Sequence, residues 1–102
     1  MRSVGDRFSF DAEVWEWGAR ASWYFVTLPT EMSDEIKVRY GARAAGFGSV
    51  RVEVTVGPTT WRTSIFPDGD RDAYVLPLKK AVRQAAALDV GEVASVALDV
   101  VA

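Results

Sequence analysis

The chain has 102 residues, of which 49% are hydrophobic and 25% are charged, and its formal net charge is −2. These values are typical of one soluble globular domain, taken here as residues 1–102, and they exclude a disordered chain. The sequence contains no cysteine and no histidine. Disulfides, thiolate nucleophiles, Cys/His zinc sites and imidazole acid–base catalysis are therefore excluded.

The chain carries no recognisable targeting or membrane segment. The first ten residues have no apolar core of signal-peptide length, and no stretch approaches the ~20 apolar residues that span a bilayer. We therefore expect a cytoplasmic protein without membrane association, acting as a monomer or homodimer. The slightly negative net charge argues against broad phosphate binding, although it allows a local basic patch.

The first half of the chain predicts two strands followed by a helix. Residues 8–14 alternate between apolar and polar side chains, which indicates a strand with one buried face. Residues 22–28 (SWYFVTL) form a β-rich run that we expect to be buried on both sides. Pro29 ends this run, and residues 30–40 are predicted to be helical, with Thr30 as the N-cap.

The second half follows a similar order after a loop rich in glycine and alanine. Four valines at every second position between residues 50 and 56 predict the clearest strand in the chain. Pro77 is expected to open a second helix, because the first helical position tolerates its missing N–H. The remaining predicted elements are a strand at 59–66, a turn at 67–70, a short strand at 74–76 and a last strand at 93–101.

The two halves, about 8–56 and 59–101, share the order strand, strand, helix, strand. Leu28-Pro29 in the first half corresponds to Leu76-Pro77 in the second. The sequence therefore predicts a mostly β fold with two short helices, built from pseudo-twofold ββαβ halves. Six such strands can close into a small double-split β-barrel, which removes exposed sheet edges.

Four segments also resemble a known family. They are FVTLP (25–29), TVGPTTWRTSIFP (55–67), YVLPLKKAVRQAA (74–86) and LDVGEVASV (88–96), and they resemble a bacterial domain-of-unknown-function family, number 1905. The resemblance implies a double-split β-barrel, of the kind grouped beside the swapped-hairpin barrels of transition-state regulators and antitoxins. It implies no established biochemical activity.

Three cations, Lys79, Lys80 and Arg83, share one stripe of the second predicted helix. They form a candidate anion-binding site, with Arg62 and Ser64 projecting together from one face of the strand 59–66. An alternative interpretation is that nearby carboxylates neutralise the stripe as ordinary surface ion pairs, namely Asp68, Asp70, Asp72 and Glu92.

The aromatic content suggests a second candidate site. Four tryptophans are many for a domain of this size, and they could line a concave apolar pocket for a small ligand. The alternative is that they pack in the barrel core. Trp15 lies on the strand face opposite to the apolar residues Phe8, Phe10, Ala12 and Val14, and it is expected to be the most exposed tryptophan. Other aromatic candidates for the pocket are Trp17, Trp23, Trp61, Tyr24, Tyr40, Tyr74, Phe25, Phe47 and Phe66.

Carboxylate clusters give little support for catalysis or metal binding. Asp68-Gly69-Asp70-Arg71-Asp72 is similar to part of a calcium-binding loop. However, Lys79 stands where the distal glutamate ligand is required, so a hairpin turn is the better interpretation. We expect neither a metal nor a cofactor.

Three functional hypotheses follow. The first is a non-enzymatic module that binds an apolar or anionic small molecule through Trp23, Trp61, Arg62, Ser64, Tyr74 and Arg83. The second is a nucleic-acid-binding regulator that contacts phosphates through Lys79, Lys80, Arg83 and Arg51. The third is a barrel enzyme that confines a small substrate without histidine or cysteine.

Overall fold

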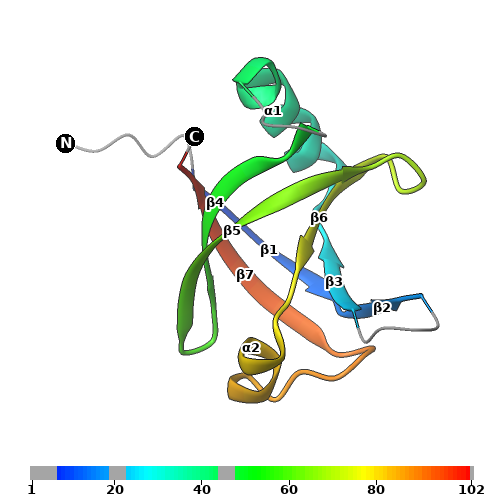
Figure 1. Ribbon diagram of the computed structural model, residues 1–102, viewed down its shortest axis with the longest axis vertical. Helices are drawn as coiled ribbons and strands as arrows, with labels where there is room; N and C mark the ends of the chain where they lie inside the picture. Colours follow the sequence, from blue (N-terminus) through cyan, green and yellow to red (C-terminus); the bar gives the residue numbers. More distant parts are fainter. Residues whose placement is uncertain (1–6, 19–22, 44–47, 102) are drawn as a thin grey trace.

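A computed structural model describes residues 7–18, 23–43 and 48–101 (Figure 1). Its elements are β1 (Arg7–Glu13), β2 (Trp15–Trp17), β3 (Trp23–Thr27), α1 (Thr30–Tyr40), the 3-10 helix η1 (Gly41–Arg43), β4 (Val50–Val56), β5 (Thr59–Asp68), β6 (Ala73–Pro77), α2 (Lys80–Ala85) and β7 (Val93–Val100). The fold is therefore mostly β, as predicted. Neither α-helix in the described part of the chain is long and apolar enough to cross a membrane.

The strands form one antiparallel sheet that curls into a half-barrel (Figure 1). Its order is β1-β7-β4-β5-β6-β3-β2, so β1 and β2 are the two edges. The predicted closed barrel of six strands is therefore wrong, because the described residues form seven strands and no ladder joins β1 to β2.

The chain changes pairing partner at Val14. The ladder between β1 and β7 ends at Glu13 and Val93. The Val14 N–H then donates to the Glu92 carbonyl at 2.9 Å, and the Val14 carbonyl accepts from the Gly91 N–H at 2.8 Å. Beyond this point the chain pairs with β3 instead of β7. The strand predicted at residues 8–14 therefore corresponds to β1, and β2 is a further short strand that was not predicted and that supplies the second ladder.

Aliphatic side chains fill the interior of the curled sheet. Every second residue of β4 is buried, beginning and ending with valine, while the residues between them are at least partly exposed. This arrangement follows from the two-residue period of side chains in a strand. Strands β3, β5, β6 and β7 contribute Val26, Ile65, Leu76 and Leu98 respectively, and none of these four side chains is accessible to solvent.

The two α-helices lie at opposite ends of the sheet (Figure 1). Helix α1 begins at Thr30, with Pro29 at the cap position and no side-chain cap, so the prediction of Thr30 as the N-cap is wrong. Helix α2 begins at Lys80 instead of Pro77. Pro77 is still paired with Phe25 at the end of β6, which delays the helix.

One buried hydrogen bond joins α1 to the sheet. Ser33 is 3% exposed, and its Oγ accepts the Tyr74 N–H of β6 at 3.0 Å. A buried N–H without an acceptor destabilises the folded state. The hydroxyl of Ser33 therefore fixes the helix against the sheet.

We predict that Ser33→Ala lowers the free energy of unfolding by about 1–3 kcal/mol, because the Tyr74 N–H loses its acceptor. Denaturant unfolding measures this change. The matched control is Ser95→Ala, which removes an exposed hydroxyl bonded to Asp11 and should change stability by less than about 0.5 kcal/mol. Equal effects of the two substitutions would contradict the structural role of Ser33.

Candidate functional site

The outer face of β2, β3 and β6 is aromatic. In the ladder between β2 and β3, Trp15 lies opposite Phe25 and Trp17 lies opposite Trp23. These four side chains share one face of the sheet, because residues two apart in a strand point the same way. The adjacent strand β6 adds Pro77 opposite Phe25 to the same face.

A groove of about 490 Å³ runs along this face. We call it the aromatic groove; its lining consists of Trp15, Trp17, Trp23, Phe25, Phe66, Pro67, Asp68, Gly69, Val75 and Pro77. Trp17 is 58% exposed, Trp23 55% and Phe66 40%. Such a concentration of exposed aromatic surface is unusual on a protein without a binding role.

Trp15 is held in place at one end of the groove. Its indole Nε1 donates to Thr27 Oγ1 at 2.8 Å, and its ring stacks on Phe25 with centroids 5.0 Å apart. The guanidinium carbon of Arg71 lies 3.5 Å from the ring centroid. Trp15 is thus only partly exposed, and the prediction that it is the most exposed tryptophan is wrong. Trp17 and Trp23 are more exposed than Trp15.

A second groove, of about 290 Å³, adjoins the first at the α2 end. We call it the basic groove, because Lys79, Lys80 and Arg83 line it together with Trp23, Tyr24, Phe25, Pro77 and Leu78. Trp23, Phe25 and Pro77 line both grooves. An aromatic surface and three cations therefore share a wall.

Arg83 has a defined position in the basic groove. Its guanidinium carbon lies 3.5 Å from the centroid of the Tyr24 ring, a cation–π contact. Its Nε is buried and has no hydrogen-bond partner within the described residues. The side chain is consequently held by stacking, and one of its donors is unsatisfied.

The carboxylates expected to neutralise the basic stripe do not do so. Asp68 pairs with Arg71 at 3.1 Å, and Glu92 accepts the Asp89 N–H in the turn before β7. Across residues 7–18, 23–43 and 48–101, no carboxylate lies within ion-pair distance of Lys79, Lys80 or Arg83. The stripe is therefore uncompensated in this part of the chain.

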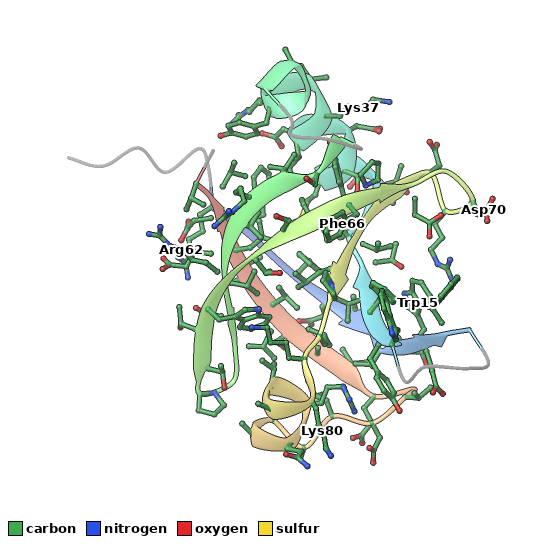
Figure 2. The ribbon with its side chains drawn as sticks, in the orientation of Figure 1. Trp15, Lys37, Arg62, Phe66, Asp70 and Lys80 are labelled. Atoms are coloured by element: carbon green, nitrogen blue, oxygen red, sulfur yellow. The ribbon has the colours of Figure 1, made fainter. Side chains whose placement is uncertain are left out.

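The other predicted site residues lie away from both grooves. Arg62 is exposed and pairs with Glu53 at 3.5 Å, on the side of the molecule away from Trp15 (Figure 2). Ser64 lies opposite Arg51 on β4 and β5. Trp61 packs against the core with its Nε1 buried and unpartnered among the described residues. Arg51, proposed for phosphate contact, likewise does not line the basic groove.

Tyr74 belongs to the core and is 5% exposed. Burial raises the pKa of its hydroxyl above the usual value. It lines a third cavity, of about 300 Å³, together with Ser33, Asp34, Lys37, Asp68 and Asp72.

The described residues contain no group of three or more carboxylates placed to hold a metal ion. Phe47, an aromatic candidate from the sequence, lies outside the described residues.

The structure confirms that the aromatic candidates Trp17 and Phe25 line a groove, and it adds Val75 and Pro77 to them. It also places Arg71 over Trp15 at the end of the groove away from α2. A signal for the aromatic pairs was present in the sequence. WEW (15–17) and WYF (23–25) each place two aromatic residues at i and i+2, which puts both on one strand face. The expectation that residues 22–28 are buried on both sides obscured this pattern, and the exposure of Trp23 shows that it was wrong.

The fold and these grooves define a small antiparallel β domain with an aromatic outer face. Residues 10–98 match a family described as Domain of unknown function (DUF1905). The chain therefore belongs to this family, as its sequence segments suggested. No curated protein matches the chain.

We predict that Trp17 and Trp23 provide most of the fluorescence that acrylamide quenches readily, because their indoles are the most exposed of those described. The double variant Trp17→Phe/Trp23→Phe should lose most of the readily quenched component. Trp61→Phe is the control and should retain it, because Trp61 packs against the core. A larger loss in Trp15→Phe than in the double variant would contradict the observed exposure.

Proposed function

We propose that this domain is a binding module for a small molecule with a flat apolar body and an anionic group. The apolar body lies in the aromatic groove and the anion lies in the basic groove. One observation carries the proposal: Trp23, Phe25 and Pro77 line both grooves, so a single ligand can contact the aromatic surface and the cations together.

The dimensions and chemistry of the aromatic groove support this function. Its volume of about 490 Å³ falls within the range of small-ligand sites, roughly 300–1,000 Å³. Exposed aromatic rings can stack on a flat ligand, and such contacts contribute about 0.5–1.5 kcal/mol beyond area burial. Trp17 and Trp23, with ring centroids 6.2 Å apart and planes inclined at 56°, offer two differently oriented surfaces to a ligand.

The uncompensated cations support the proposal that the ligand carries an anionic group. Lys79 and Lys80 are exposed, and Arg83 is oriented by its stacking on Tyr24. An anion at this position would gain charge-assisted hydrogen bonds without having to displace an internal carboxylate. The local positive charge is compatible with the net charge of −2, because acidic residues lie elsewhere on the surface.

The proposal predicts that 1-anilinonaphthalene-8-sulfonate binds more tightly than N-phenyl-1-naphthylamine, which has the same rings without the sulfonate. The difference should decrease as salt screens the cations. In Trp23→Ala the sulfonate probe should bind at least about fivefold more weakly, because a stacking surface worth about 1 kcal/mol is lost. Fluorescence titration of each probe measures both effects.

The control variant is Val38→Ala, which removes an apolar side chain that is 85% exposed on α1. It should bind both probes as the unmodified protein does. Near-ultraviolet circular dichroism of each variant checks that the fold is retained. Unchanged sulfonate binding in Trp23→Ala, or equal loss in Val38→Ala, would disprove binding in the aromatic groove.

A further inference from the structure

We infer that the anionic group of the ligand is a phosphate ester carried on a planar ring. The phosphate contacts Lys79, Lys80 and Arg83, and the ring stacks on Trp23. This inference rests on the proposed function, because it assumes that one ligand occupies the two adjoining grooves. The number of cations in the basic groove identifies the anionic group, and the carboxylates at the opposite end of the aromatic groove identify the direction in which the ligand lies.

The number of cations favours phosphate over carboxylate. A carboxylate carries one charge and two acceptor oxygens, whereas a phosphate monoester carries up to two charges and three oxygens. Three cations line one small groove, and none has a carboxylate partner within the described residues. A carboxylate would leave much of this positive charge unbalanced, whereas a phosphate has an oxygen for each cation.

Arg83 adds a geometric argument. Arginine presents a planar set of donors that matches phosphate oxygens, while lysine acts as a compact charge. The stacking of Arg83 on Tyr24 restricts the plane of the guanidinium before a ligand arrives. Its Nε is buried, so the donors offered to a phosphate are those of its two terminal nitrogens. The two lysines can then adjust to the remaining oxygens, because their side chains are exposed.

The opposite end of the aromatic groove determines the direction of the ligand. There, Asp68 lines the groove and neutralises Arg71, which covers Trp15. Asp72 lies in the neighbouring cavity that shares Asp68. A phosphate at this end would meet carboxylates and one cation that is already paired. The phosphate therefore lies at the α2 end, and the ring extends toward Trp17 and Trp23.

Isothermal titration calorimetry with three matched probes tests the inference: 1-naphthyl phosphate, 1-naphthoate and 1-naphthol. At low ionic strength the phosphate should bind most tightly and the uncharged naphthol most weakly. In the double variant Lys79→Ala/Lys80→Ala, the affinity for naphthyl phosphate should fall by about tenfold, the effect expected for two partly exposed charge contacts. The affinity for naphthol should remain the same.

Arg71→Ala is the matched control, because it removes a cation from the other end of the same aromatic groove. It should preserve the preference for phosphate. The inference is overturned if naphthoate binds as tightly as naphthyl phosphate, or if the preference survives in the double lysine variant. If naphthoate matches naphthyl phosphate but both anions still bind more tightly than naphthol, in a way that depends on Trp23 and on the two lysines, the proposed function remains intact. If none of the naphthalenes binds, both the inference and the proposed function are wrong.

Two further probes distinguish the source of such a ligand. Adenosine monophosphate represents a free nucleotide, and a short single-stranded oligothymidylate represents nucleic acid. Equal affinity per site for both probes supports a free phosphate ester. A much tighter oligothymidylate complex, with an affinity that falls steeply with salt, supports single-stranded nucleic acid. Either result requires the same lysines, and independence of both probes from Lys79 and Lys80 would overturn the assignment of the basic groove.

Discussion

The aliphatic packing inside the curled sheet determines what its outer face presents. Val26 of β3 and Leu76 of β6 are fully buried and lie opposite each other in the ladder. Because side chains alternate along a strand, their neighbours Phe25 and Pro77 must point outward. The aromatic groove is therefore a consequence of filling the interior with small aliphatic residues, and its position is as firmly fixed as the core.

The sequence predicted those elements whose pattern is local. The alternating valines of β4 and the helical spacing before Tyr40 placed a strand and a helix close to their observed bounds. The point at which the chain leaves one ladder for the next was not predictable in this way. It lies at Val14, whose backbone bonds to Gly91 and Glu92, and contacts between such distant residues leave no periodic signal in one sequence.

The electrostatic environment of the basic stripe could not be read from sequence proximity. Asp68, Asp70 and Asp72 precede Lys79 by few residues, which suggested ion pairs. However, β6 (Ala73–Pro77) is extended between them, and five extended residues span roughly 16 Å at about 3.3 Å each. Asp68 thus lines one end of the aromatic groove, whereas the lysines line the basic groove that adjoins its other end. Acidic and basic residues that are close in the sequence are therefore separated in the structure by the length of β6.

The proposed site is largely separate from the interactions that hold the fold together. Trp17 and Trp23 are more than half exposed, so they bury less apolar surface than the core residues and contribute less to stability. Exposed aromatic residues beside the edge strand β2 also increase the risk of association with other chains. Folding alone would therefore be served as well by polar residues at these positions. The presence of aromatic side chains there, next to cations without ion-pair partners among the described residues, is therefore the basis of the proposed ligand site.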